Sequence, residues 1–132
     1  MITREADYAI RTIRFFYQNK NIVKLISTKT LSEETEVPYR FLRKIVKKLV
    51  DAKILISQKG KGGGLALFPR KTDLSLLDIL EIIDPLNIKL NICTSTKKIC
   101  SRSTTCPVCK ELTILQEKFH SELSKVTFDC LI

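Results

Sequence analysis

The stretch 38–51 constrains the fold most, because it predicts a helix whose two faces differ in chemistry. Pro38 suits the first turn of a helix. One face is apolar and is expected to be buried, and it consists of Phe41, Leu42, Ile45, Val46, Leu49 and Val50. The other face carries Tyr39, Arg40, Arg43, Lys44, Lys47 and Lys48, with no acidic residue before Asp51. A solvated helix face usually mixes charge signs to gain i,i+4 pairs. This face is therefore predicted to contact a polyanion.

The charge of the whole chain is concentrated in the same half. Residues 1–70 hold 15 Lys and Arg against 6 Asp and Glu, whereas residues 71–132 hold 8 of each kind. The net charge of +9 thus belongs entirely to the first part. A basic half joined to a neutral half is the pattern expected of a nucleic-acid-binding module attached to something else. A basic surface that served only solubility would not be divided in this way.

The segments around the basic helix predict a winged helix-turn-helix. Helices are expected over 3–19 and 28–34, and short strands over 54–57 and 65–68. The intervening loop contains all four glycines, which permit a tight turn and a close approach to another surface. A nucleotide-binding glycine loop would precede a helix, whereas a strand ending at Pro69 follows here. The predicted fold class is mainly α, with a small β-hairpin wing and a recognition helix that enters the major groove.

The predicted partner is double-stranded DNA. Arginine is the commonest reader of guanine in the major groove, and lysine mainly neutralises phosphates. The residues expected to contact DNA are Thr28, Tyr39, Arg40, Arg43, Lys44, Lys47, Lys48, Lys59 and Lys61.

The second half predicts a helix over 73–83 capped by Asp73, an irregular loop, and a long helix over about 110–128. The long helix carries an apolar seam typical of helix pairing, formed by Leu112, Leu115, Phe119, Leu123 and Val126. We expect a homodimer through this helix and therefore an inverted-repeat operator. The predicted organisation is a DNA-binding domain over 1–84, a cysteine-rich cluster-binding loop over 85–109, and a dimerisation helix and tail over 110–132.

Four of the five cysteines, Cys93, Cys100, Cys106 and Cys109, lie within 17 residues. The chain begins with charged residues where a signal peptide would have its apolar stretch, and no apolar run approaches the roughly 20 residues of a membrane span. We therefore expect a cytoplasmic protein without a membrane partner. Because the cytosol keeps thiols reduced, the cysteine cluster predicts metal or redox chemistry.

The spacing of the cysteines leaves three kinds of site open. Four thiolates suit a closed zinc site, but such sites usually use two short-spaced pairs, and only Cys106 and Cys109 form one. An iron–sulfur cluster accepts wider and uneven spacing. A thiol switch at the same pair would lack the strand-then-helix setting of thioredoxin-like proteins. An enzyme would need a substrate pocket and a second redox centre or cofactor motif, so we expect a regulator and not an enzyme.

Over nearly its whole length the chain resembles the winged-helix transcription regulators of the IscR, NsrR and CymR type. The resemblance covers segment 3–11, segment 31–49, the wing 59–64, segment 74–80, the cysteine loop and the terminal helix. It implies a homodimeric regulator, expected to be a repressor, that senses redox state, nitric oxide or iron–sulfur status. It also implies that Cys93, Cys100 and Cys106 hold a two-iron or four-iron cluster.

The resemblance leaves the fourth ligand open between two residues. Cys109 stands where IscR-like members carry a histidine ligand, and Asp7 matches the acidic ligand of NsrR-like members. Thiolate suits iron–sulfur centres better than carboxylate. Ligation by Asp7, however, would tie the cluster to the DNA-binding half. Without a cluster, the alternative is a winged-helix regulator that uses its cysteines as a zinc site or a thiol switch.

Overall fold

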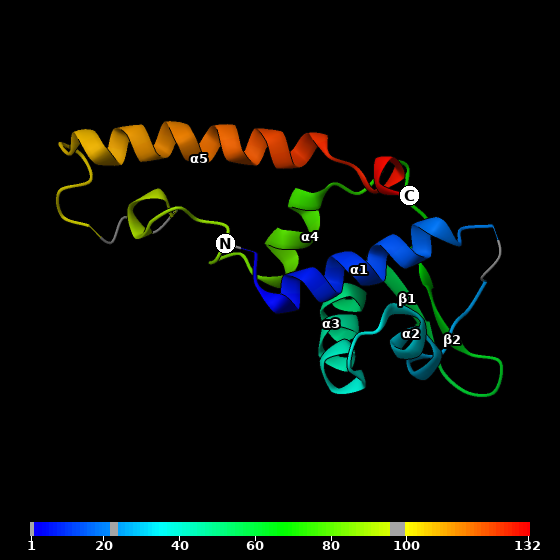
Figure 1. Cartoon of the computed structure of the whole chain (residues 1–132). Coiled ribbons are helices and arrows are strands. Elements are labelled where there is room, and N and C mark those ends of the chain that lie inside the picture. The colour runs from blue at the N-terminus through cyan, green and yellow to red at the C-terminus, as the bar shows by residue number, and fades with distance from the viewer. Residues whose placement is uncertain (1, 22–23, 96–99) are drawn as a thin grey trace.

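The computed structural model describes residues 2–21, 24–95 and 100–132, and it is mainly helical (Figure 1). The first part consists of α1 (Arg4–Gln18), α2 (Thr28–Thr35), α3 (Tyr39–Asp51), β1 (Leu55–Gln58) and β2 (Gly64–Leu67). The second part consists of α4 (Leu76–Ile83), the 3-10 helix η1 (Ile92–Thr94), α5 (Pro107–Lys125) and the 3-10 helix η2 (Phe128–Leu131). The predicted fold class, a winged helix-turn-helix with a small hairpin, is confirmed.

One apolar core joins the helices of the first part to α4 and to the end of the chain. α1 begins where the Thr3 hydroxyl accepts a hydrogen bond from the Ala6 amide, and α2 begins where Ser27 does the same for Thr30. The largest side chains of the core are fully buried: Ile13, Leu31, Leu42, Ile45, Leu49, Leu80 and Phe128. Because Phe128 belongs to η2, the chain returns from α5 into the core of the first part.

The turn between α2 and α3 is tight. Glu36 adopts the left-handed conformation with a φ of 54°, Val37 is buried, and Pro38 immediately precedes α3. The predicted burial of Phe41 is wrong, because its side chain is 46% exposed. Its ring contacts the ring of Tyr8 at a centroid distance of 5.9 Å, at the edge of the core.

The first strand of the hairpin begins at Leu55, one residue later than the sequence predicts. Ile54 donates its amide to the Leu49 carbonyl at 2.8 Å, so it closes the turn after α3, and the ladder begins at Leu55. Gly64 allows a close approach, since a Cβ atom there would lie 2.7 Å from the carbonyl oxygen of Ile26. Ile26 thereby pairs with Leu65 and adds a short third edge to the two strands.

α4 begins at Leu76, and its cap is Ser75 instead of the predicted Asp73. Ser75 and Asp78 form a reciprocal capping box. The residues before the helix are extended because they pair with the chain after α5. The Leu76 amide donates to the Val126 carbonyl, and the Phe128 amide donates to the Leu74 carbonyl, both at 2.9 Å. This pairing between distant segments explains the later start.

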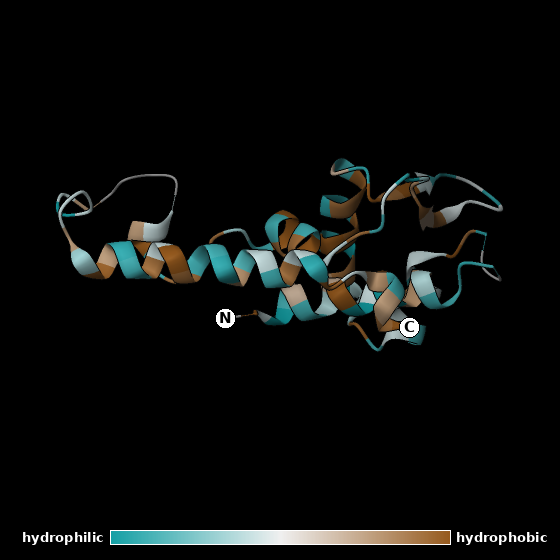
Figure 2. Ribbon diagram, turned by 90° about the horizontal axis from the view of Figure 1, so that it is seen from above, coloured by the Kyte–Doolittle hydropathy of each residue, from teal (hydrophilic) through white to brown (hydrophobic). Residues whose placement is uncertain are grey.

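α5 begins at Pro107, three residues before the predicted start, so Cys109 lies on the helix and not in the loop. The helix ends at Lys125, and Val126 is already extended. Seen from above, α5 is a straight helix that carries hydrophobic residues along its length and extends beyond the first part (Figure 2). Of its apolar residues, Ile114 and Phe119 are each 38% exposed and Leu115 is 51% exposed. Within the described ranges, no helix is long and apolar enough to cross a membrane.

Candidate nucleic-acid interface and cysteine pocket

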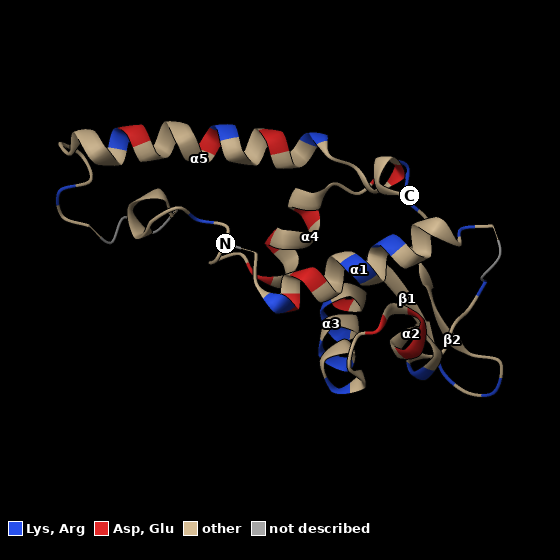
Figure 3. Ribbon diagram, viewed as in Figure 1, with Lys and Arg blue, Asp and Glu red and all other residues tan. Residues whose placement is uncertain are grey.

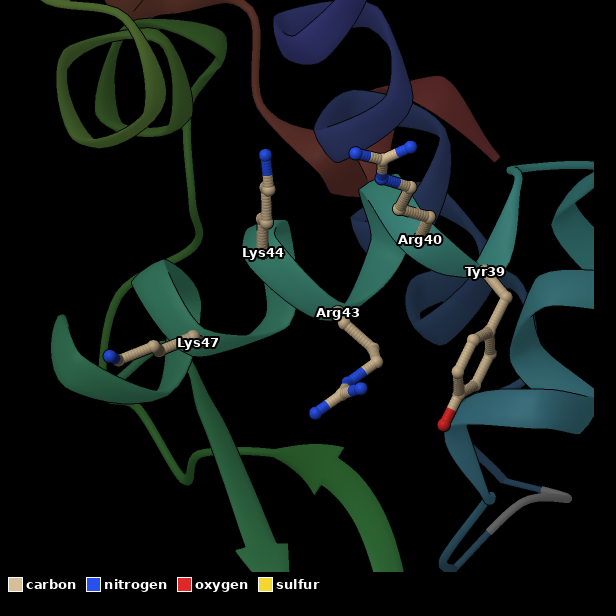
Figure 4. Close-up of a pocket in the computed structure, with 5 residues that line it drawn as sticks. All are labelled: Tyr39, Arg40, Arg43, Lys44 and Lys47. Atoms are coloured by element: carbon tan, nitrogen blue, oxygen red, sulfur yellow. The ribbon is translucent and has the colours of Figure 1, made fainter.

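The exposed side of α3 forms a shallow depression of about 400 Å³, lined by Tyr39, Arg40, Arg43, Lys44 and Lys47. Arg40 and Lys44 stand one helical turn apart, and so do Arg43 and Lys47, which gives two basic ridges on one helix. In Figure 4 Tyr39 and Arg43 point to one side of α3, whereas Arg40 and Lys44 point to the other. We call the surface of these four cations the basic face.

A second hollow of about 230 Å³ connects the basic face to α2 and the hairpin. Arg43 and Lys47 line it together with Thr28 at the start of α2 and Ser57 on β1. The structure therefore places Thr28, one of the predicted DNA contacts, beside Arg43 and Lys47 of α3. A hydroxyl at a helix start beside two cations can bind an anion such as a phosphate.

The two predicted lysines of the wing, Lys59 and Lys61, are exposed between β1 and β2. The turn that carries them includes Gly62, whose φ of 75° favours glycine. Figure 3 shows Lys and Arg along α3 and at the tip of the hairpin, on the side of the molecule away from α5. Neither wing lysine lines the depression on α3. Lys59 and Lys61 therefore add positive charge to the surface beside it.

Lys48, another predicted DNA contact, does not line either hollow on α3. Its Nζ atom lies 2.8 Å from Glu5 Oε1 and donates to the Ile83 carbonyl oxygen at 3.1 Å. It thus ties α3 to α1 and to the end of α4. The helical pattern of 38–51 could not show this, because both acceptors come from other elements.

The four clustered cysteines line one pocket of about 290 Å³. Cys93 belongs to η1, Cys106 caps α5 and Cys109 lies on its first turn. The remaining lining residues include Cys100 and the cation Arg102. Cys109 is buried, and its Sγ atom lies 3.8 Å from the carbonyl oxygen of Cys93. Of the predicted cysteine-rich loop, residues 96–99 lie outside the described residues.

The pocket brings the cysteines together without a preformed site for one ion. All five cysteines are free thiols. In the part of the chain that the structure describes, no three His, Cys, Asp or Glu side chains are placed to hold a single metal ion. Burial raises the pKa of the Cys93 thiol, and the neighbouring Cys109 adds to the increase. Cys130 is exposed near the C-terminus and does not line the pocket.

Asp7, the other candidate for a fourth ligand, does not line the pocket of its own chain. It lies on α1, where its Oδ2 atom is 3.0 Å from Arg11 Nη2. The same guanidinium donates to the Thr35 carbonyl oxygen at 3.5 Å, at the end of α2, and lies over the ring of Tyr8. Asp7 is therefore connected through Arg11 to the helix-turn-helix.

Two residues that the sequence did not indicate are Arg102, which lines the pocket, and Gln116, which contacts the segment leading to it. Arg102 brings a positive charge next to the thiols. Gln116 on α5 is only 5% exposed and bonds to the backbone of the segment before η1. A usable signal for Gln116 is its spacing, since it follows Cys109 by two helical turns and thus shares its face.

The fold and the basic face define a winged-helix protein of the kind that binds DNA. The chain belongs to the Rrf2 family, described as iron-dependent transcriptional regulators, whose family model matches residues 2–132. Its members are transcription regulators. No curated protein matches the sequence significantly.

Three solved structures share the fold at low sequence identity. The oxidized form of Staphylococcus aureus CymR has 20% identity and a TM-score of 0.72, over 99% of this chain and 94% of that chain. IscR of T. potens has 18% identity and a TM-score of 0.72, over 99% and 85%. CymR of B. subtilis, its global cysteine regulator, has 17% identity and a TM-score of 0.73, over 99% and 94%.

Proposed function

We propose that this chain is a homodimeric transcriptional repressor that binds an inverted-repeat operator and responds through an iron–sulfur cluster in the cysteine pocket. The observation that carries the proposal is the convergence of Cys93, Cys100, Cys106 and Cys109 on one pocket, although they come from η1, from the loop and from α5. The basic face lies on a different element, α3. Sensor and DNA contacts are thus separate sites on one chain.

The chemistry of the pocket suits a cluster better than a single zinc ion. Thiolates are the usual ligands of iron–sulfur clusters, and a cluster is larger than one ion. Four thiols around a pocket of about 290 Å³ leave room for the larger group. Arg102 offsets part of the negative charge that several thiolates would bring together. When bound, the cluster would supply a centre that oxidants, nitric oxide or iron loss can alter.

Two residues remain candidates for the fourth ligand. Cys109 already lines the pocket, whereas Asp7 would have to come from the partner copy and leave Arg11. Because Arg11 also contacts the end of α2, ligation by Asp7 would change the helix-turn-helix directly. Binding or loss of the cluster would then shift the population between two geometries of the dimer. Reconstituted Asp7→Ala and Cys109→Ala proteins separate the two candidates, since only loss of the true ligand alters the spectrum and makes the cluster labile.

The dimer would form through α5. Leu115 and Phe119 are exposed on this helix and lie about one turn apart. We expect Phe119→Asp to sediment as a monomer and to bind operator DNA far more weakly. Ser121→Asp is the matched control, because Ser121 is exposed on roughly the opposite side of the helix. A Phe119→Asp protein that stays dimeric contradicts this assembly.

The decisive experiment on the cofactor is an absorption spectrum of anaerobically purified protein, with iron and sulfide analysis. We expect equal amounts of iron and sulfide and a visible band that Cys93→Ala and Cys106→Ala each abolish. Cys130→Ala is the control and should leave the band unchanged, since Cys130 lies outside the pocket. A protein that carries only zinc, or a normal band in both pocket variants, refutes the cluster.

The second candidate is a thiol switch without a cluster. It is favoured by the proximity of Cys93 and Cys109, where a sulfur lies 3.8 Å from the other residue's carbonyl. The raised pKa of Cys93 argues against fast oxidation, because the thiolate is the reactive form. Peptide mapping after peroxide treatment of metal-free protein tests this candidate. A disulfide within the pocket that releases DNA would support it, and unchanged thiols with unchanged DNA binding would exclude it.

A further inference from the structure

Gln116 is the best-buried polar side chain near the cysteine pocket. It is 5% exposed and lies on the inner side of α5. Its Oε1 atom accepts a hydrogen bond from the Leu90 amide at 2.7 Å, and its Nε2 atom donates to the Ile88 carbonyl oxygen at 2.9 Å. The Thr94 hydroxyl, which donates to the Asn91 carbonyl, lies 3.2 Å from the same Oε1 atom. One side chain therefore provides hydrogen-bond partners for two backbone groups of the segment 88–90.

The two backbone bonds have the pattern of a strand pair. A residue in a parallel strand bonds the carbonyl before and the amide after its neighbour, and the Gln116 amide does this on either side of Lys89. The segment 88–90 leads directly into η1, which contains Cys93. Gln116 is thus hydrogen-bonded to the backbone segment that immediately precedes the helix of Cys93.

The side of the pocket opposite Cys93 is formed by Cys109, which lies on α5 like Gln116. Cys109 precedes Gln116 by seven residues, so both project from one face of α5. The Cys109 sulfur approaches the Cys93 carbonyl, while Gln116 bonds the segment just before η1. These two contacts set the distance between η1 and the first turn of α5.

We propose that Gln116 is the positioning residue of the cysteine pocket: it holds Cys93 in register with Cys109 so that their thiols face the same space. The inference rests on the proposed function only for what the thiols bind. The positioning itself belongs to the chain and can be measured without any cluster.

The first test uses metal-free protein and dibromobimane, which joins two thiols that lie close together. Tandem mass spectrometry of tryptic peptides measures the Cys93–Cys109 product. We expect the yield to fall at least tenfold in Gln116→Met, which keeps the side-chain length and removes both hydrogen bonds. Glu117→Met is the matched control, because Glu117 is the exposed neighbour on the same helix, and it should react like the wild type. A folded Gln116→Met protein with the wild-type yield overturns the proposal.

Two measurements keep the proposal testable if Gln116→Met does not fold. Gln116→Asn keeps an amide but is one methylene too short to reach both partners, and a wild-type yield in this variant also overturns the proposal. In the unchanged protein, hydrogen exchange at the Leu90 amide should be slow, because Gln116 Oε1 accepts its proton. Exchange as fast as in an unstructured chain would contradict the positioning role.

The cluster and the positioning role fail separately. If the wild type holds no iron while the crosslink depends on Gln116, the cluster is wrong and the inference stands. If the wild type holds a cluster and the crosslink is insensitive to Gln116→Met, the inference is wrong and the cluster stands. Where both hold, reconstituted Gln116→Met should lose its visible band at least tenfold faster than Glu117→Met, measured at a temperature at which both proteins remain folded.

Discussion

Lys47 and Lys48 are adjacent on α3, but their surroundings differ. Lys47 lines both hollows of the basic face. Lys48 is paired with Glu5 at 2.8 Å and also bonds the Ile83 carbonyl. We therefore expect Lys47→Ala to weaken DNA binding in a salt-dependent way and Lys48→Ala to leave that dependence unchanged.

The expected magnitude follows from counterion release. Each neutralised phosphate contributes about 0.9 to the slope of log affinity against log salt. A dimer carries Lys47 twice, so Lys47→Ala should reduce the magnitude of this slope by about 1.8. Between roughly 50 and 200 mM salt, the fall in affinity should therefore be about 12-fold smaller for the variant than for the wild type. For Lys48→Ala we expect only a loss of about 0.2–1 kcal/mol in unfolding free energy, because both side chains of its pair with Glu5 are more than a third exposed.

The assay is fluorescence anisotropy of a labelled duplex, titrated with each protein at several salt concentrations. Chemical denaturation of the same preparations measures the unfolding free energy. Equal slope changes in Lys47→Ala and Lys48→Ala would refute the distinction between Lys47, which lines the basic face, and Lys48, which is bonded to Glu5 and Ile83. A slope unchanged by Lys47→Ala would refute its contact with DNA.

Three further predictions concern other parts of the molecule. Arg43→Ala should cost about 1–3 kcal/mol in operator binding and relax the preference at one base pair of each half-site, as a binding selection would show. Phe128→Ala should lower the unfolding free energy by about 3–5 kcal/mol, since the ring is fully buried against Tyr17, as chemical denaturation would measure. Hydrogen bonds from Asp73 and then Lys20 hold the pKa of Asp129 below its ordinary value of 3.8. The bond between the two carboxyl groups also raises the pKa of Asp73, so the two effects oppose each other, and the stabilisation we expect from Asp129 is that of its ion pair with Lys20 at 3.0 Å. This ion pair is present above pH 3.8 and is lost as the pH falls below it, so thermal midpoints of Asp129→Asn and wild type should converge in acid.

The elements with local signals were predictable from the sequence. α1, α2 and α3 begin at or next to the expected residues, because their caps and their apolar periods lie within the elements themselves. The glycine loop predicted the hairpin for the same reason. The grouping of the four cysteines in one pocket also agrees with their closeness in sequence.

The differences arise where distant segments meet. α4 starts late because Leu74 and Leu76 pair with the chain after α5, a contact that no local window contains. Lys48 is bonded away from the basic face because its acceptors, Glu5 and the Ile83 carbonyl, come from α1 and α4. Gln116 was missed because a polar residue in an amphipathic pattern is expected to face solvent, whereas here the backbone of 88–90 satisfies it.

α5 is anchored in the core at its C-terminal end and lines the cysteine pocket at its N-terminal end. Its far end leads through Val126 into η2, whose Phe128 is rooted in the core beside α1, and its near end carries Cys109 at the pocket. Nineteen helical residues span about 28 Å. A shift of about 2 Å at the cysteine end therefore corresponds to a rotation of about 4° about the root. Phe128 and the buried residues of α3 belong to one apolar core, so we expect a small change in the dimensions of the pocket to reach α3 as a change of angle.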